Sequence, residues 1–298
     1  MKKYLFIANP SSGAGRSKKA IEKIDQIMKD SGKSYDIVST KESYFAEEII
    51  NKHIDDYTDF IAVGGDGTVT DVGRALVQKK KGTLGIIPAG TGNDFSLALK
   101  IPKDIKEALD LILREDRQVK EVDIPSINGK AYLNITSIGF DADVVKLTNS
   151  IKKIIKSEVA YVISVILSLL RFRKSEIELI IDGKSHYINS FLLAVGKGKY
   201  YGGGMPIMPN AELENGYLEV CSVKDASNLT ILRLFPSIFK ASHTKHIKYV
   251  TMYKAKEVIA KLDKDMILNI DGELIEANKE RTLSFRIEDY KLPVVSNL

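Results

Sequence analysis

Apolar and polar positions follow two different periods along this chain. In roughly the first 125 residues, short apolar runs alternate with segments whose apolar residues recur every three or four positions. The runs predict strands and the segments predict helices, with the strands at 4–8, 35–39, 60–62 and 84–87. Asp104 and Glu107 form a capping-box pattern that predicts a helix over 105–113. Regular alternation of this kind is typical of a doubly wound parallel α/β domain.

From about residue 119 the pattern changes to strands joined by tight turns. Asn128-Gly129 and Asp182-Gly183 each lie between two strand-like runs and predict β-hairpins. Further strands are expected at 217–223, 250–254, 256–262, 266–270 and 282–287. The second half therefore predicts an antiparallel β domain of the sandwich type.

Three glycine-rich loops each follow a predicted strand of the first domain, at 9–16, 64–68 and 90–95. Ligands of open parallel sheets bind at the carboxyl ends of the strands, so these loops are expected to converge. Glycine permits positive φ and close backbone approach to an anion, and Asp66 is the one charge inside its loop. One such loop alone is also consistent with a simple turn. The three together predict a site for a polyphosphate with a metal ion.

Four motifs in this order carry a resemblance to a known family. They read Asn-Pro-x-Ser-Gly-x-Gly at 9–15, Gly-Gly-Asp-Gly-Thr at 64–68, Gly-Thr-Gly-Asn-Asp-Phe at 90–95 and Asp-Gly-Glu at 271–273. Together they resemble the bacterial diacylglycerol-kinase-like lipid kinases, from residue 4 to about 290. The resemblance implies an ATP-dependent, Mg²⁺-requiring kinase that phosphorylates the hydroxyl of diacylglycerol or a related membrane lipid.

The same resemblance implies two domains with the active site in the cleft between them. The nucleotide-binding α/β domain is expected over 1–122, with 282–298 returning to it. The β-rich lipid-binding domain, an antiparallel β-sandwich, is expected over 123–281.

The resemblance also assigns roles to residues of this chain. Glu273 is expected as the general base, with Asp271 assisting it and Asp66 completing the catalytic set. Asp66, Asp123 and Asp94 are expected to hold the catalytic Mg²⁺, partly through water. The expected nucleotide-binding residues are Asn9, Ser12, Gly13, Gly15, Arg16, Thr40, Gly64, Gly65, Gly67, Thr68, Gly90, Thr91, Gly92 and Asn93.

Two features of the sequence complicate the assignment of those roles to this chain. Many family members hold a structural metal in a loop ending Asp-Asp-Gly, where this chain has Glu214-Asn215-Gly216. Asn215 and Tyr217 remain as candidate ligands, but the loss of both carboxylates weakens that expectation. Asp271-Gly272 also matches a plain hairpin turn of the kind expected at Asp182-Gly183.

Composition and cysteine content indicate where the protein works and that it contacts a membrane from outside. The 298 residues are 44% hydrophobic and 28% charged, as in globular proteins. Cys221 is the only cysteine, so no internal disulfide can form, and a small core residue is the expected role. No apolar run approaches the roughly 18 residues of a spanning helix. We expect a cytoplasmic protein, peripheral to the membrane.

The net charge of +5 is concentrated rather than spread evenly. Segment 150–174 has one acid, Glu158, against the basic residues Lys152, Lys153, Lys156, Arg171, Arg173 and Lys174. Its apolar middle fits a helix packed on the β domain, and its basic ends fit contact with an anionic membrane. The acid-free stretch 240–256 has five lysines and two histidines that fit the same role.

Two other functions remain open at this stage. An NAD kinase shares the Gly-Gly-Asp-Gly loop, although the loops at 9–15 and 90–95 argue against it. A non-catalytic nucleotide- or lipid-binding module would have lost an acid among Asp66, Asp123, Asp271 and Glu273, and none is lost. No nucleic-acid-binding motif accompanies the basic residues, and a homodimer is possible. The acceptor lipid is not encoded in any motif.

Overall fold

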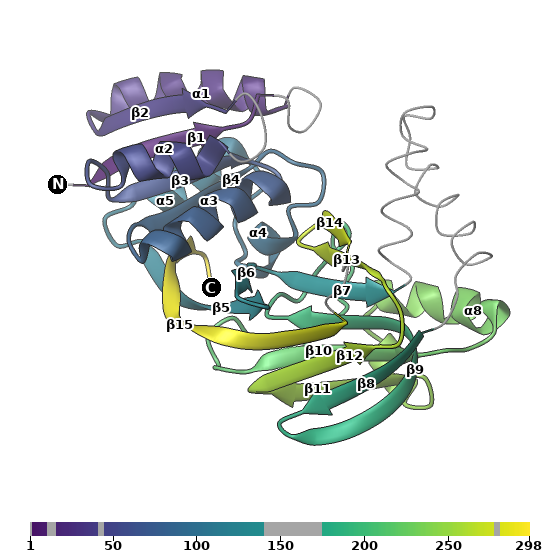
Figure 1. Cartoon of the computed structure of the whole chain (residues 1–298). Helices are drawn as coiled ribbons and strands as arrows, with labels where there is room; N and C mark the ends of the chain where they lie inside the picture. Colours follow the sequence, from purple (N-terminus) through teal and green to yellow (C-terminus); the bar gives the residue numbers. More distant parts are fainter. Residues whose placement is uncertain (1, 11–15, 41–44, 140–174, 277–280) are drawn as a thin grey trace.

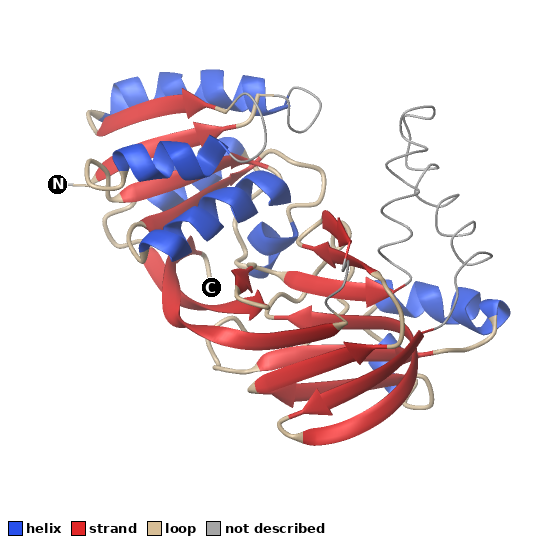
Figure 2. Ribbon diagram, in the orientation of Figure 1, coloured by secondary structure: helices blue, strands red, loops and turns tan. Residues whose placement is uncertain are grey.

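The computed structural model describes residues 2–10, 16–40, 45–139, 175–276 and 281–298 (Figure 1). Ser12, Gly13 and Gly15 of the first loop, and the basic segment 150–174, lie outside these ranges. The described chain forms an N-terminal α/β domain and a C-terminal β domain, as the sequence predicts (Figure 2). No helix within the described ranges is long and apolar enough to cross a bilayer.

The first domain is a four-stranded parallel sheet in the order β4-β3-β1-β2. Its strands are β1 (Lys3–Ala8), β2 (Ser34–Ser39), β3 (Asp59–Gly64) and β4 (Thr83–Pro88). The helices are α1 (Arg16–Ser31), α2 (Phe45–His53), α3 (Asp66–Lys79), α4 (Asp94–Ala98) and α5 (Ile105–Leu113). Helices α1 and α5 contact each other, as do α2 and α3, so the sheet is covered on both faces.

Local sequence explains the boundaries of these elements. Every residue of β3 is buried, as expected for a central strand of a parallel sheet. Helix α5 starts where the capping pattern predicts, because the Asp104 carboxylate accepts the N–H groups of Lys106 (2.8 Å) and Glu107 (3.1 Å). In this parallel sheet the loops that lead from β1, β3 and β4 to the following helices leave from the same edge.

The second domain is antiparallel. Its strands are β6 (Lys130–Ala131), β7 (Ile135–Gly139), β8 (Ser175–Ile181), β9 (Lys184–Gly196), β10 (Leu218–Lys224), β11 (Val250–Ala255), β12 (Glu257–Leu262), β13 (Ile267–Ile270) and β14 (Glu273–Glu276). Both predicted Asx-Gly hairpins form, with positive φ at Asn128 (47°), Gly129 (79°), Asp182 (44°) and Gly183 (80°). These are the values that a tight two-residue turn requires.

Both faces of this sheet carry an apolar cluster. Leu193 and Val195 of β9 belong to one cluster, and Leu192 and Ala194 to the other, because successive side chains of a strand point to opposite faces. Cys221 lies in the second cluster, where burial raises the pKa of its thiol to about 12. The cysteine is a core residue, as its sequence context suggests.

Two long strands join the domains into one continuous sheet. Strand β15 (Thr282–Ser296) pairs with β12 near its start and reaches β4 near its end, at Val294↔Leu84. Strand β5 (Gln118–Ile127) runs antiparallel beside it. The last strand therefore passes from the β domain back to the parallel sheet, and it fixes how the two domains face each other (Figure 1).

Two helical elements of the β domain, and the short α4 of the first domain, were not predicted from the sequence. Helix α8 (Asn228–Phe239) begins after Ser227, whose hydroxyl accepts the N–H of Thr230 at 3.3 Å. A short 3-10 helix, η2 (His243–Lys245), follows it before β11. Ile231, Phe235 and Ile238 of α8 pack on the core, whereas Leu229, Leu232 and Phe239 are exposed.

Candidate active site

The three glycine-rich loops begin side by side. Strands β1, β3 and β4 are parallel neighbours, with Ala8 opposite Val63 and Gly64 opposite Pro88. The Ala89 N–H donates to the Gly64 carbonyl at 2.8 Å, which ties the start of the third loop to the second. Asn9 follows Ala8 at the same edge. The described parts of the three loops therefore start together at one edge of the sheet, as predicted.

Among the described loop glycines, all but Gly67 lie where an added Cβ would be crowded, and none needs positive φ. None of Gly64, Gly65, Gly67, Gly90 or Gly92 has a positive φ, contrary to the sequence-based expectation. A Cβ added at Gly90 would overlap the Cα of Gly65, and one added at Gly92 would come within 2.6 Å of the Asp66 carboxylate. The second and third loops thus pack backbone against backbone, which only glycine allows.

Asp66 holds these two loops together. Its Oδ2 accepts the N–H of Asn93 at 2.7 Å, and its Oδ1 accepts that of Phe95 at 3.4 Å. Burial raises the pKa of this carboxyl, and the backbone N–H groups of Phe95, Asn93 and Asp94 oppose the rise. Asp66 therefore positions the third loop, in addition to any contact with a ligand.

The amino terminus of α3 provides donors for an anion. Its N-cap, Gly65, makes no side-chain cap, and the first intrahelical bond runs from the Val69 N–H to the Gly65 carbonyl. The N–H groups of the first turn and the helix dipole both favour a negatively charged group here. Phosphate is the ligand that such a terminus commonly binds.

Other predicted nucleotide residues divide into exposed and structural positions. The Arg16 guanidinium donates to the Thr91 hydroxyl at 3.2 Å, so first and third loops meet at the surface. The buried Thr40 hydroxyl donates to the Ala8 carbonyl at 3.3 Å, which is a structural contact. The Asn93 amide closes its own loop by bonding both the N–H (3.0 Å) and the carbonyl (3.1 Å) of Gly90.

One face of α3 connects this edge to the β domain. Asp66, Thr70 and Arg74 are spaced four residues apart, so they lie on the same side of the helix. The Thr70 hydroxyl donates to Asp271 Oδ2 at 3.2 Å, and Arg74 Nη1 donates to Glu273 Oε2 at 3.0 Å. Helix α3 therefore carries Asp66 in its first turn and contacts the carboxylates of Asp271 and Glu273 one and two turns later.

Asp271 forms the hairpin turn and also binds backbone beside the neighbouring strand β7. It has φ of 51°, and Ile270 pairs with Glu273 on either side of the turn, so the simple-turn interpretation is correct as far as the backbone goes. The carboxylate additionally accepts N–H groups from Leu133 (2.7 Å), Asn134 (3.0 Å) and Ile135 (3.0 Å). Its bonds to these neighbours make Asp271 a positioning group for the hairpin.

Glu273 lies between two cations. Its Oε2 is 3.0 Å from Arg74 Nη1 and 3.2 Å from Lys130 Nζ, and its side chain is 31% exposed. Charge-assisted contacts of this kind are short and hold a carboxylate in one orientation. Glu273 is therefore oriented and reachable, which are the two properties that a general base needs.

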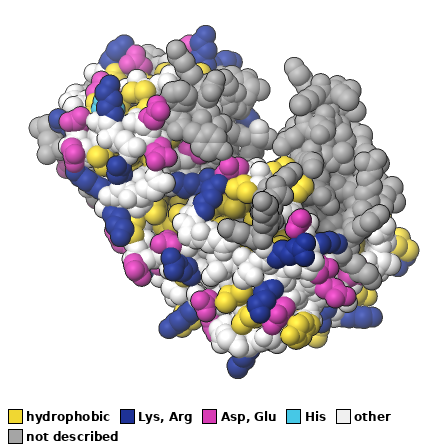
Figure 3. Space-filling model, in the orientation of Figure 1, with side chains coloured by type: hydrophobic (Ala, Val, Ile, Leu, Met, Phe, Trp, Pro, Cys, Tyr) yellow, Lys and Arg dark blue, Asp and Glu magenta, His cyan; other side chains and the backbone are white. Residues whose placement is uncertain are grey.

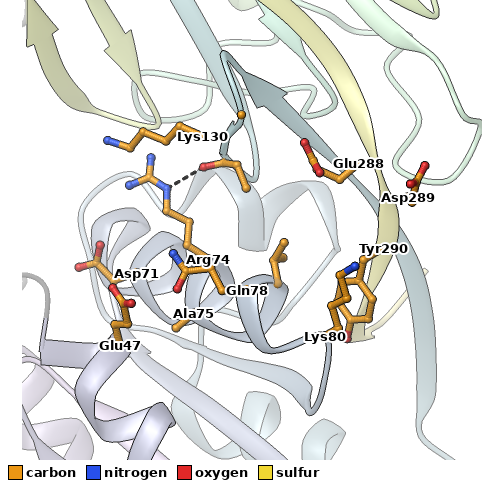
Figure 4. A pocket seen from close by; sticks show the side chains of 13 residues that line it. Glu47, Asp71, Arg74, Ala75, Gln78, Lys80, Lys130, Glu288, Asp289 and Tyr290 are labelled. Atoms are coloured by element: carbon orange, nitrogen blue, oxygen red, sulfur yellow. Dashed lines mark hydrogen bonds between the residues drawn. The ribbon is translucent and has the colours of Figure 1, made fainter.

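Arg74 and Lys130 also line a cavity of about 410 Å³ between α3 and β15 (Figure 4). Arg74 Nε donates to the Ala131 carbonyl at 2.9 Å there. Most of the other lining side chains are polar or charged, including Glu47, Asp71, Gln78, Lys80, Glu288 and Asp289. Such a lining does not suit acyl chains, so this cavity is not a lipid-tail pocket.

Comparisons with known proteins agree with this geometry. The family model described as the diacylglycerol kinase catalytic domain matches residues 3–127, and the YegS C-terminal NAD kinase beta sandwich-like domain matches 134–288. A diacylglycerol kinase of Staphylococcus saprophyticus is 30% identical over 91% of this chain and 89% of that protein. The chain belongs to the diacylglycerol kinase family.

Further relatives place this family member among lipid kinases. A diacylglycerol kinase of Staphylococcus aureus strain MRSA252 is 30% identical over 91% of this chain and 86% of that protein. The crystal structure of a diacylglycerol kinase from Bacillus anthracis str. Sterne matches with a TM-score of 0.76 and 25% identity, covering 99% of this chain and 97% of that one. The enzyme class is that of lipid kinases, which transfer a phosphoryl group to an alcohol.

In this family member the side chain of Asp94, in the α/β domain, binds backbone of the β domain. Its carboxylate accepts the N–H groups of Gly203 (3.0 Å) and Gly204 (2.6 Å), which belong to a turn of the β domain. Burial, and then the neighbouring Asp66 charge, raise the pKa of Asp94 to about 6. Asp94 is thus a buried carboxylate close to the half-buried carboxylate of Asp66.

The Asp94 pKa predicts a pH dependence. A pKa raised from 3.8 to about 6 means that the folded chain favours the protonated acid, so this group stabilises the fold at low pH and the contribution is lost as pH rises through about 6. A magnesium ion bound at Asp94 would favour its charged form and lower this pKa, so the value of about 6 applies before a metal binds. We expect the magnesium affinity of the wild type to fall below about pH 6, because protons then compete with the ion for the carboxylate, measured by calorimetry over a pH series. Asp94→Asn should lose this pH dependence, and an unchanged dependence would contradict the assignment.

The catalytic Mg²⁺ implied by the resemblance fits Asp66 and Asp94 but not Asp123. The charge repulsion between the first two carboxylates is what a bound cation relieves. Asp123 instead meets Lys197 Nζ (3.0 Å from Oδ2) and Lys291 Nζ (3.0 Å from Oδ1), and accepts the Gly216 N–H at 2.6 Å. The prediction of Asp123 as a metal ligand is corrected, because protein cations already neutralise it. Within the described ranges, no three His, Cys, Asp or Glu side chains gather as a metal site.

The second, structural metal of the family does not fit the loop at Asn215 and Tyr217. The candidate ligands Asn215 and Tyr217 do come together, but on the ammonium of Lys197, which is fully buried. Nζ donates to Asn215 Oδ1 at 2.7 Å and to the Tyr217 carbonyl at 2.9 Å. Burial acts to raise the pKa of Asp123, yet the Gly216 N–H and the two lysines together hold it below its usual value. The lysine ammonium is the cation of this loop, and the expectation of a metal there is corrected.

This arrangement predicts a stability that does not depend on divalent metal. Lys197→Met leaves Asp123 buried with one partner fewer, and breaking a buried pair in this way costs about 3 kcal/mol in free energy of unfolding. Thermal and urea unfolding would measure the loss, with the exposed Lys184→Met as matched control. A chelator should leave the melting temperature of the wild type unchanged. A fall on chelation that magnesium reverses would contradict the role given to Lys197.

Of the four cations that pair with the candidate acids, all but Arg74 had no signal in the sequence. Arg74, Lys130, Lys197 and Lys291 contact acids 74 to 199 residues away along the chain. None lies in a glycine-rich motif, and each is one of 44 Lys and Arg residues. Only Arg74 offered a usable hint, since it lies two turns after Asp66 on the same predicted helix.

Proposed function

We propose that this lipid kinase transfers the γ-phosphoryl group of ATP to the hydroxyl of diacylglycerol or a related membrane lipid. The observation that carries the proposal is the shared face of α3. Its first turn offers donors to phosphate and contains Asp66, and later turns bind Asp271 and Glu273 through Thr70 and Arg74. A phosphate site and an oriented carboxylate are thereby fixed to one rigid element, which favours transfer between them.

The proposed reaction divides among residues of both domains. The lipid hydroxyl oxygen attacks the γ-phosphorus, the bond to the bridging β–γ oxygen breaks, and ADP leaves. Glu273 accepts the hydroxyl proton, while Arg74 and Lys130 hold its carboxylate in place. Asp271 positions the hairpin that carries Glu273.

The nucleotide phosphates are assigned to the α3 terminus and the adjoining loops, including Arg16 and Thr91. A magnesium ion bound at Asp66 and Asp94 would neutralise charge that develops on the transferred group. Asp66 also keeps the second and third loops in contact. Their position at the domain boundary suits a nucleotide that enters from the α/β side and a lipid that enters from the β side.

An acceptor panel tests this proposal. Purified protein would be incubated with ATP, magnesium and diacylglycerol, monoacylglycerol, phosphatidylglycerol, an isoprenoid alcohol, a sphingoid base or NAD, followed by mass spectrometry of the products. We expect a phosphorylated glycerolipid. A phosphorylated NAD alone would favour the NAD-kinase-like alternative, to which the β-sandwich match also relates. ATP binding without any product would favour a non-catalytic module.

We also propose that the enzyme works in the cytoplasm, peripheral to a membrane. Its acceptor would remain in the bilayer, so part of the protein surface has to meet lipid headgroups. The segment 150–174, the first sequence-based candidate, lies outside the described residues.

A further inference from the structure

Helix α8 presents hydrophobic side chains to solvent. Leu229, Leu232 and Phe239 are 57%, 43% and 57% exposed, and Pro236 is exposed between them. Their spacing of three and four residues places them on one stripe of the helix. Ile231 is the only α8 residue that is fully buried. Ile231, Phe235 and Ile238 of α8 pack on the core. The exposed stripe is therefore additional to the inward one, and an exposed apolar patch of this kind is typical of an interaction surface.

The turn after α8 continues the same surface. Ile247 is 82% exposed, the highest value among the large exposed hydrophobic side chains of the described residues. Lys245 and Lys248 flank it and are exposed as well. The Phe239 ring packs edge-on against Phe235 at 5.7 Å, so this exposed ring is held and not free to fold away. We call α8 together with residues 240–248 the α8 face.

Charge decides which partner suits this face. No acid occurs from residue 226 to 256, while six Lys and Arg residues do. Arg233, Lys240, Lys245 and Lys248 belong to the α8 face and are exposed. In Figure 3, basic and hydrophobic side chains, with acidic ones close by, are visible at the edge of the β domain where α8 lies. A second copy of the chain would bring like charges together, whereas an anionic lipid surface complements them.

We infer that the α8 face docks this enzyme on anionic membranes, with its hydrophobic side chains entering the headgroup layer and its cations contacting lipid phosphates. The inference deepens the proposed function by naming the surface that meets the substrate membrane. Each cation near such a leaflet contributes about fivefold to partitioning, and the attraction decays within roughly 8–10 Å at physiological salt. Binding through this face is therefore sensitive to both lipid charge and salt.

The test compares three variants by co-sedimentation with phosphatidylcholine vesicles with or without phosphatidylglycerol. The first reverses charge at Lys240→Glu, Lys245→Glu and Lys248→Glu. The second replaces Leu232, Phe239 and Ile247 with serine. The control reverses three exposed lysines of the α/β domain, Lys52→Glu, Lys103→Glu and Lys106→Glu. Circular dichroism and melting temperatures establish that each variant is folded.

We expect the wild type and the control to bind only the vesicles with phosphatidylglycerol. The charge reversal should weaken that binding at least about 100-fold, and the serine variant should weaken it as well. Equal binding by the wild type and the charge reversal overturns the inference. A second outcome also overturns it: light scattering shows that the wild type is a dimer, the serine replacements dissociate this dimer, and the wild type does not bind vesicles.

A soluble acceptor separates this inference from the proposed function. All the folded variants should phosphorylate dispersed dioctanoylglycerol at similar rates, because none alters the cleft. If no form of the protein phosphorylates any lipid but vesicle binding still depends on the α8 face, the proposed function fails and the docking surface stands. If the soluble lipid is phosphorylated but vesicle binding does not depend on these residues, the proposed function stands and the docking surface fails.

Discussion

Replacing Glu273 with glutamine is expected to lower turnover about 10²- to 10⁴-fold, the usual contribution of a general base. Glutamine keeps the size of the side chain but cannot accept the hydroxyl proton. The hairpin itself should stay in place, because Asp271 is bound to Leu133, Asn134 and Ile135 independently of residue 273. ATP affinity should therefore change little, measured by calorimetry beside single-turnover rates.

Two comparisons sharpen this prediction. Glu257→Gln makes the same chemical change at an exposed site on β12 and should keep full activity. Arg74→Met should lower turnover less than Glu273→Gln, since Lys130 still contacts the carboxylate. If Glu273→Gln weakens nucleotide binding and spares turnover, Glu273 belongs to the nucleotide or metal site and not to proton transfer.

Asp66→Ala is expected to lower turnover by about 10²-fold or more, because charge neutralisation in the transition state is commonly worth a few kcal/mol. The structure adds a second effect that the sequence did not predict. The carboxylate accepts N–H groups of Asn93 and Phe95, so its removal leaves buried donors unpaired and costs about 1–3 kcal/mol in free energy of unfolding. Urea unfolding measures this loss, and turnover is compared where both proteins are folded.

The control for Asp66 is Asp110→Asn, an exposed position on α5 that should change neither quantity. Asp66→Asn should retain more stability than Asp66→Ala, since one oxygen remains to accept an N–H. Turnover by folded Asp66→Ala equal to the wild type would remove Asp66 from the catalytic set and leave it a purely structural residue.

Local rules account for what the sequence could predict. The strands and helices of the first domain follow from apolar periodicity, the two Asx-Gly turns from their φ requirement, and the start of α5 from its capping residue. The converging loops follow from parallel topology alone. These features depend on neighbours within a few residues, which is the range over which a single sequence carries information.

The remainder depends on contacts between distant parts of the chain. The return of 282–298 to the first domain was expected only from the family resemblance, because its pairing with β12 and β4 is set by tertiary packing. The partners of Asp123 are set by tertiary packing as well. Asp123 was expected to bind metal because of the family resemblance. Its position in the sequence gives no information about Lys197, which comes 74 residues later and occupies that place. The loop glycines were identified correctly but explained incorrectly, since close packing of Gly65 on Gly90 can only be seen in three dimensions.

The most direct test of the central claim is transfer of labelled phosphate from γ-labelled ATP to diacylglycerol in mixed micelles, in the presence of magnesium. We predict that label appears in phosphatidic acid with the wild type, and that Glu273→Gln gives at most about 1% of that rate while still binding ATP. Release of label only as inorganic phosphate, or an equal yield of phosphatidic acid from both proteins, would contradict the account.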